Sequence, residues 1–230
     1  MIYTLDGGSI WSPPTNGDYG FKTIDGPKMT FIDVGKDGRV IAYDDENMYF
    51  REGVTPDNPM GDSWKKFITL DGQTFKSAAL CTNGYIWTVR CNDDACETHV
   101  IEDANDDYPY GQGTFQKVNG AGNNDVVWIS CGQHGTTIGV TSNGKAFFRT
   151  GTGEEKPSGD DWESIGSDFA NVAVGDDGVI WGVHSDNSIE YRTDVSSSKP
   201  SGSDWGEVDG QLKLVAIGTH SVWMFGCFRS

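Results

Sequence analysis

One short pattern recurs along the chain at near-regular intervals, and it constrains the fold more than any other feature. In this pattern an apolar stretch ends in a glycine or a cysteine, and a polar turn such as KDG, TNG or DDG follows in several copies. The recurring residue stands at five positions, 43 to 51 residues apart: Gly35, Cys81, Gly132, Gly175 and Gly218. A repeat of this length predicts a series of like units, each of which buries its apolar face against a neighbour.

Each unit predicts four short β-strands. The first is apolar on both faces, as in FANVAVG, which is typical of a strand covered on both sides. The second has an aromatic or aliphatic centre, at Ile41, Trp87, Ile138 and Trp181. The third alternates aromatic and polar residues, as in AFFR and IEYR. The fourth opens with an aromatic residue, at Phe21, Trp64, Phe115, Trp162 and Trp205.

The fifth copy is incomplete at the C-terminus, and the N-terminus supplies the missing pieces. The segments MIYTLDGGSIW and FKTI match the middle and the end of a unit, and the distance from Gly218 round to Gly35 is 47 residues, or one more period. We therefore predict one all-β domain over residues 1–230. It is a five-bladed β-propeller of four-stranded antiparallel blades, closed by pairing N- and C-terminal strands in one blade. Both SVWMFG and MIYTLD suit the second strand of that blade.

Charge and hydropathy exclude several kinds of partner. The chain has 34 acidic and 17 basic residues, a formal net charge of −17, which repels phosphate backbones and anionic lipid heads. We expect no nucleic-acid partner. No apolar run is long enough to span a bilayer, so we expect no membrane insertion. The start MIYTLDGGSIW lacks the features of a signal peptide, which favours the cytoplasm, or secretion if a signal was removed.

The cysteines and histidines do not indicate a metal site or an active site. Cys91 and Cys96 flank the turn Asn-Asp-Asp-Ala and can face each other across a hairpin, where an oxidising compartment would allow a disulfide. A single CxxxxC pair is a poor zinc signal. The four histidines do not cluster, and no G-x-S-x-G nucleophile motif is present. We expect no enzymatic activity, no cofactor and no bound metal.

The unit resembles the tectonin repeat, also called the fish egg lectin or tachylectin-type propeller repeat. The matching pieces are VAVGDDGVIWGV, SIEYR and GSDWGEV, and the copies together cover nearly the whole chain. The second copy departs from the pattern, with Cys81 for the usual Gly and Glu102 for the usual Arg. The resemblance implies a β-propeller. It also implies lectin activity toward glycans such as N-acetylated or O-methylated sugars, although some tectonin repeats occur in intracellular scaffolds that bind proteins.

Three groups of residues are candidates for carbohydrate binding, and each has a structural alternative. The strand-four tryptophans Trp64, Trp162 and Trp205 can stack on a sugar ring or wedge between blades as packing. The strand-three arginines Arg51, Arg149 and Arg192 can bind hydroxyls or form ion pairs with a neighbouring Asp. The hairpin residues can bind paired hydroxyls or serve the turn itself; they are Asp44, Asn47, His184, Asp186 and Asn187.

From these features we predict a non-enzymatic, multivalent lectin with equivalent glycan sites between blades. Several weak sites on one rigid body would give avidity without any single strong site. The alternative is an intracellular protein-interaction scaffold of the tectonin-repeat type, whose acidic rim would bind a basic partner.

Overall fold

The structure is a computed structural model of the 230-residue chain. It describes residues 2–4, 22–35, 38–81, 84–93, 95–102, 109–111, 114–121, 125–132, 135–153, 155–175, 177–218 and 221–225. Phe21, predicted to open a fourth strand, lies outside the described residues. Among the described residues, no helix is long and apolar enough to cross a membrane.

Four sheets of four antiparallel strands make up the body of the chain. Blade 1 consists of β3 (Phe31–Val34), β4 (Val40–Tyr43), β5 (Asn47–Glu52) and β6 (Ser63–Thr69). Blade 2 consists of β7 (Thr74–Leu80), β8 (Ile86–Cys91), β9 (Cys96–Ile101) and β10 (Phe115–Val118). Blade 3 consists of β11 (Val126–Cys131), β12 (Thr137–Thr141), β13 (Ala146–Arg149) and β14 (Trp162–Gly166). Blade 4 consists of β15 (Phe169–Val174), β16 (Ile180–His184), β17 (Ile189–Arg192) and β18 (Trp205–Val208).

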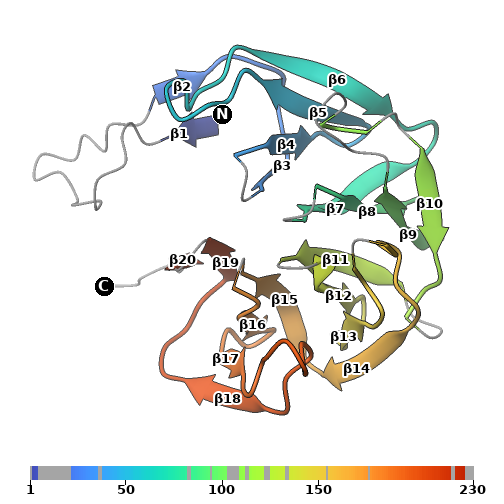
Figure 1. Ribbon diagram of the computed structural model, residues 1–230, viewed down its shortest axis with the longest axis vertical. Helices are drawn as coiled ribbons and strands as arrows, with labels where there is room; N and C mark the ends of the chain where they lie inside the picture. The colour runs from blue at the N-terminus through green and yellow to red at the C-terminus, as the bar shows by residue number, and fades with distance from the viewer. Residues whose placement is uncertain are drawn as a thin grey trace, which may run out of the picture.

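The blades fan around a common centre in chain order, as a propeller does (Figure 1). The first strand of each blade lies innermost and the fourth lies at the periphery (Figure 1). Successive inner strands contact one another, β3 with β7, β7 with β11 and β11 with β15. The predicted all-β fold with four-stranded antiparallel blades is confirmed.

Each end of the chain adds a two-stranded antiparallel sheet. The C-terminal pair is β19 (Leu214–Gly218) with β20 (Ser221–Phe225), and β19 contacts β15 of blade 4. The N-terminal pair is β1 (Ile2–Thr4) with β2 (Lys22–Ile24). Among the described residues, no backbone pairing joins the two pairs. Figure 1 shows them on either side of the gap in the ring.

The recurring residue of the sequence marks the same turn in every blade. The amide of Gly35, Cys81, Gly132 and Gly175 donates in each case to the carbonyl four residues later. We call these four residues the anchors. The turn also needs a left-handed residue three places after each anchor, and glycine with φ between 78° and 89° stands there in all four blades.

Apolar layers between neighbouring blades form the core. The layer between blades 1 and 2 contains Ile41, Met48 and Ile86, and the layer between blades 2 and 3 is built around Trp87 and Trp162. Similar layers separate blade 3 from blade 4 and blade 4 from β19. Because the inner strands of blades 2, 3 and 4 have a neighbour on both sides, most of their side chains are apolar on both faces, as the sequence predicted.

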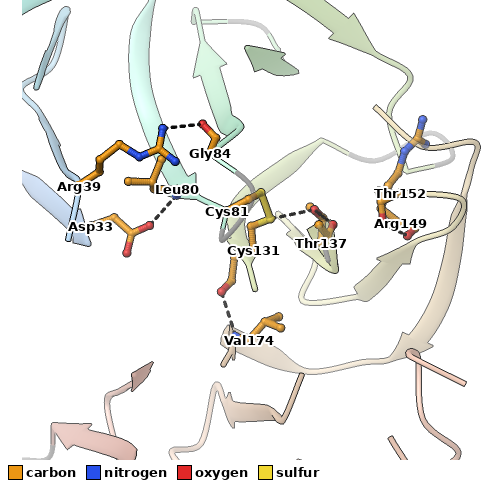
Figure 2. The surroundings of a disulfide bond; sticks show 12 residues. Asp33, Arg39, Leu80, Cys81, Gly84, Cys131, Thr137, Arg149, Thr152 and Val174 are labelled. Atoms are coloured by element: carbon orange, nitrogen blue, oxygen red, sulfur yellow. Dashed lines mark hydrogen bonds between the residues drawn. A yellow bond between two sulfur atoms is a disulfide. The ribbon is translucent and has the colours of Figure 1, made fainter. Parts of the chain in front are cut away.

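Hydrogen bonds tie neighbouring inner strands together. The Asp33 carboxylate accepts from the Leu80 amide at 2.7 Å, and the Ser130 hydroxyl accepts from the Val174 amide at 3.0 Å. Both side chains stand two residues before an anchor. The corresponding residue of blade 2 is Ala79, which has no acceptor, and there the inner strands of blades 2 and 3 are joined by a disulfide between Cys81 and Cys131 (Figure 2).

A second disulfide closes the hairpin of β8 and β9. Cys91 and Cys96 are directly opposite in the ladder and are bonded, as the sequence allowed. This bond stays within one blade, whereas the Cys81–Cys131 bond crosses between two blades and spans 50 residues of sequence.

Candidate functional site

Three blades carry the same pair of facing side chains where strand three ends and strand four begins. Arg51 is opposite Trp64, Arg149 is opposite Trp162, and Arg192 is opposite Trp205 in the ladders. The guanidinium carbon lies 5.2, 5.2 and 5.3 Å from the centre of the indole. These distances suit a cation–π contact. The structure therefore brings these six candidate residues together as three pairs.

Each arginine also holds the loop that connects strands three and four. The Nε group donates to the carbonyl of Met60, Ser158 or Ser201 at 2.7–2.8 Å. The next residue is a glycine with φ between 60° and 65° in all three loops, so the chain turns there in the left-handed region. We call an arginine with its tryptophan a clamp, and the loops 53–62, 150–161 and 193–204 the clamped loops.

The tryptophans wedge between blades. The Trp162 indole donates to the carbonyl of Asn119, at the end of blade 2, at 2.7 Å, and the Trp205 indole donates to the carbonyl of Ile165 in blade 3. Trp162 is only 9% exposed, while Trp64 and Trp205 are half-buried. Trp162 and Trp205 thus pack between blades, and Trp64 and Trp205 keep an accessible part.

Burial differs among the three arginines. Arg51 and Arg149 are buried, and Arg192 is half-buried. Burial lowers the pKa of the Arg149 guanidinium below its usual range, against the opposing charges of Asp161 and Asp160. Its Nη1 group has no hydrogen-bond partner, whereas one Nη group of Arg192 lies 3.4 Å from the carbonyl of Ile165. These arginines bind main-chain carbonyls, which differs from the ion pairs considered as their structural role.

The first hairpin group, Asp44 and Asn47, is occupied by its own turn. Oδ1 of Asp44 accepts from the backbone amides of Glu46 and Asn47, and Oδ2 accepts from the Tyr49 hydroxyl at 3.0 Å. Burial alone raises the pKa of Asp44, but the hydrogen bonds outweigh it and bring the pKa below its usual range. This is the local turn chemistry typical of Asp.

The second hairpin group, His184, Asp186 and Asn187, is also engaged locally. His184 Nε2 lies 2.8 Å from a carboxylate oxygen of Glu190. The Asp186 carboxylate accepts from the amide and the hydroxyl of Ser188, and the hydroxyl bond lowers the pKa of Asp186. Asn187 has a φ of 77°, a left-handed turn position that Asn tolerates.

The hairpin residues and the clamps lie at opposite ends of the same strands. Asn47 begins β5 and Arg51 stands near its end, so about 13 Å separates their backbones at the usual rise of a strand. In blade 4 the hairpin residues likewise precede β17, while Arg192 ends it. The structure therefore brings the tryptophans and arginines together. Of the hairpin residues only His184 comes near a clamp, because its ring stacks on Phe169 at 4.1 Å and Phe169 packs against Trp205 at 4.5 Å between ring centres.

Comparison with protein families decides the relationship that the repeats suggest. Residues 66–226 match the tectonin domain, and residues 34–66 match a family described as a propeller. The chain belongs to the tectonin domain family. The match spans more than half of the sequence and includes two of the three clamps. No curated protein sequence matches this tectonin chain significantly.

Solved structures share the tectonin chain's fold at low sequence identity. It is similar to the mitotic checkpoint complex structure, with a TM-score of 0.53 at 14% identity, covering 84% of this chain and 56% of that one. Human WBSCR16 has a TM-score of 0.53 at 9% identity, covering 90% and 62%. YCF48 bound to D1 peptide has a TM-score of 0.50 at 11% identity, covering 85% and 59%. The chain thus spans less than two thirds of these proteins, and the likeness concerns the fold alone.

Blade 2 departs from the tectonin clamp in a way that the sequence only partly signals. Ile101 is opposite Phe115 in the ladder, so it takes the arginine's place that the sequence assigned to Glu102. Glu102 follows it and reaches into blade 3, where its carboxylate accepts from the Ser158 amide at 3.1 Å. Arg90 of strand two lies over Phe115 instead, with 4.2 Å between the guanidinium carbon and the ring centre. The sequence pointed to Glu102 as a departure, but nothing in it marked Arg90. Within the described ranges, no group of three or more His, Cys, Asp or Glu side chains is placed to hold a metal ion.

Proposed function

We propose that this tectonin propeller is a non-enzymatic lectin that binds carbohydrate at its periphery, between neighbouring blades and beside the clamped loops. We call each of these places a mouth. The observation that carries the proposal is the repetition of the clamp in blades 1, 3 and 4. A sugar site needs an apolar wall with a few converging polar groups. The indole and the guanidinium next to it supply both, and the arginine holds the loop main chain in the same form each time.

The exposure of the clamps ranks the three mouths. In blade 4, Trp205 and Arg192 are both half-buried, so both can contact a ligand. In blade 1, Trp64 is half-buried and its arginine is buried. In blade 3, Trp162 is 9% and Arg149 is 3% exposed, which leaves little surface for a ligand. The proposal is therefore a divalent lectin with its stronger site in blade 4 and a weaker one in blade 1.

N-acetylated or O-methylated sugars fit this chemistry best. An acetamide carbonyl accepts from a guanidinium, and a methyl group packs on an indole edge. Each site is shallow and weak, and two sites on one rigid body bind a multivalent glycan by avidity.

The test combines a glycan array with a matched pair of variants. The wild-type protein should bind N-acetylated or O-methylated glycans on the array. Trp205→Phe removes part of the accessible indole and should weaken binding about fivefold, as expected for the loss of about 1 kcal/mol of aromatic contact. Isothermal titration with the selected sugar measures the change.

Trp162→Phe is the control, because it makes the same chemical change in the closed mouth of blade 3. It should leave sugar affinity unaltered while lowering stability to a degree similar to Trp205→Phe. An array without any bound glycan at high protein concentration would rule out the lectin. Capture of a basic protein in a salt-sensitive manner, with no glycan bound, would favour the scaffold function instead.

We also propose that the ring has five blades and that the terminal pairs together form the fifth. The C-terminal pair would supply strands one and two, and the N-terminal pair strands three and four. A packing contact supports this order. A Cβ at Gly26, just after β2, would lie 2.5 Å from the Trp64 ring, as a Cβ at Gly166, ending β14, would lie 2.7 Å from the Trp205 ring. β2 thus meets blade 1 as β14 meets blade 4.

The two disulfides support maturation in an oxidising compartment, and we propose secretion or an equivalent route over the cytoplasm. Disulfides persist in such compartments and are rare in the cytosol. The protein isolated from its source without reductant should expose one of its five thiols to a labelling reagent, as read by intact mass. Labelling of all five thiols would support the cytoplasmic location instead.

A further inference from the structure

One contact recurs wherever the inner strands of two neighbouring blades meet, from blade 2 onward. We call each such place a joint. The anchor of one blade meets the residue just before the recurring position of the next copy: Cys81 meets Cys131, Gly132 meets Val174, and Gly175 meets Ile217, which precedes Gly218. A Cβ placed on Gly132 would lie 3.2 Å from Cβ of Val174, and one on Gly175 would lie 3.5 Å from Cβ of Ile217. A disulfide needs about 3.5–4.5 Å between its Cβ atoms. The glycine joints therefore have nearly the geometry that the disulfide joint has.

The residues that face the preceding blade are buried in blades 2, 3 and 4 and exposed in blade 1. The residue just before the anchor is 3% exposed at Leu80, 9% at Cys131 and 5% at Val174, but 60% at Val34. Two residues earlier, Ile32 is 38% exposed where Ala78 is 1% exposed. An apolar inner strand of this kind gains stability when it is covered.

The adjoining strand shows the same deficit. Val40 begins β4 and is half-buried, although the equivalent residues Ile86 and Ile180 are fully buried. Among the described residues the exposed large apolar side chains are Ile32, Val34 and Tyr191. Tyr191 lies on the other side of the gap, beside Trp181, which packs against the layer between blade 4 and β19. All three thus border the place of the fifth blade.

The free face of β19 complements this surface. Val215 and Ile217 pack toward blade 4, so the alternate residues Leu214 and Ala216 face away from it. Ala216 is exposed and Leu214 is half-buried. Small and apolar residues thus stand on both sides of the gap.

We infer that β19 docks on the exposed face of β3, with Gly218 opposite Val34, and closes the ring through the joint that Cys81 and Cys131 form elsewhere. We call this contact the seam. The occupant of the Ile32–Val34–Val40 surface is thus the C-terminal pair of the same chain. The inference rests on the proposed five-bladed ring and is independent of whether the protein binds sugar.

The natural disulfide supplies the experiment, because it can be moved to the seam. The double variant Val34→Cys with Gly218→Cys, in a Cys227→Ser background, should form an intramolecular disulfide on mild oxidation. Peptide mapping by mass spectrometry without reductant detects the cross-link, and gel filtration shows whether the product is a monomer. Gly175→Cys with Ile217→Cys places the same pair at a described joint and serves as the positive control.

Ile32→Cys with Gly218→Cys is the register control, since Ile32 lies on the same face two residues away. It should cross-link at least tenfold less than the Val34 pair. Absence of the Val34–Gly218 cross-link while the positive control forms would overturn the inference. A cross-linked dimer would also overturn it, because a second copy would then occupy the surface.

A single substitution tests the seam even if the double variant does not fold. Val34→Cys alone should react with a maleimide at least tenfold more slowly than Ser63→Cys, which stands on the exposed start of β6. Equal rates for the two thiols would overturn the inference. Failure of sugar binding would leave both of these measurements unaffected.

Discussion

Blade 4 holds its neighbours through the regular tectonin residues, while blade 2 has replaced most of them. Blade 4 has Gly175 as its anchor and Arg192 over Trp205 as its clamp. The corresponding places in blade 2 are filled by Cys81, Ile101 and Phe115.

The replacements in blade 2 restore contacts by other chemistry. At the joint between blades 2 and 3, Ala79 offers no side-chain acceptor, but the Ser77 hydroxyl accepts from the Ile129 amide and a disulfide is added. Glu102 accepts from blade 3, and Arg90 covers Phe115. The propeller thus keeps a contact between neighbouring blades, although the residue types that make this contact differ between blades 2 and 4. Disrupting the substitutes in blade 2 should therefore destabilise the protein, as should disrupting the packing of blade 4.

The largest expected effect is the loss of the disulfide between blades. Cys81→Ala with Cys131→Ala should lower the free energy of unfolding by about 4 kcal/mol, because the bond closes a long loop in the unfolded chain. Urea denaturation measures the change. The Cys91–Cys96 bond closes a much shorter loop, so its removal in Cys91→Ala with Cys96→Ala should cost about 2 kcal/mol. A larger loss of unfolding free energy for Cys91→Ala with Cys96→Ala would contradict the prediction that the bond between blades contributes more to stability.

The second effect is a pH dependence to which His99 of blade 2 contributes. Burial, with the charge of Arg90 beside it, lowers the pKa of His99 from 6.5 to about 4. The unfolded chain takes up this proton near pH 6.5 and the folded chain only near pH 4. The stabilisation is therefore complete above pH 6.5 and is lost as the pH falls toward 4. Between pH 7.5 and 5.0 the loss should be about 2 kcal/mol.

His99→Gln is the control for this pH dependence, because the amide accepts from Arg90 but does not titrate. Urea unfolding at the two pH values should then show a difference about 2 kcal/mol smaller than in the wild type. An unchanged difference would mean that folding does not lower the pKa of His99.

The third effect tests the packing of blade 4. A Cβ on Gly182 would lie 2.4 Å from the ring of Phe169, which itself packs against Trp205. Gly182→Ala should therefore cost about 1.5 kcal/mol, the usual range for overpacking. Gly153→Ala adds the same methyl where nothing lies within 4 Å and should change the thermal midpoint little. Equal midpoints for the two variants would show that Phe169 yields without cost.

The smallest effect goes in the opposite direction and concerns the equivalent position of blade 2. Thr88 stands where blade 4 has Gly182, and its buried hydroxyl has no hydrogen-bond partner. Thr88→Val keeps the shape and removes the unpaired group, so it should raise the free energy of unfolding by about 1 kcal/mol. A loss of stability in urea would show that the hydroxyl is satisfied in solution.

Much of the architecture follows from the repeat, because the repeat records which residues play the same part. The anchors, the apolar inner strands and the facing arginine and tryptophan pairs stand where the spacing places them. The Cys81–Cys131 bond was beyond such reasoning. Cys81 is an anchor and Cys131 precedes one, and only the structure reveals that these two places touch across a joint.

The candidate site was predictable in part, and its error has a simple physical reason. Residue types alone placed Asp44 and Asn47 with Arg51 in one site. Asn47 and Arg51 lie toward opposite ends of one strand, and the four steps from Asn47 to Arg51 put about 13 Å between their backbones. Local turn chemistry explains the hairpin residues, while the burial that distinguishes Trp162 from Trp205 depends on the neighbouring blade.

The arginine clamp has one consequence for how this surface can diversify. The Nε group of Arg51, Arg149 or Arg192 grips a peptide carbonyl, an atom that every amino acid provides. The clamped loops can therefore change nearly all of their side chains and still bind the arginine through the main chain. Such an attachment allows the loop sequence to vary while the blades keep their arrangement.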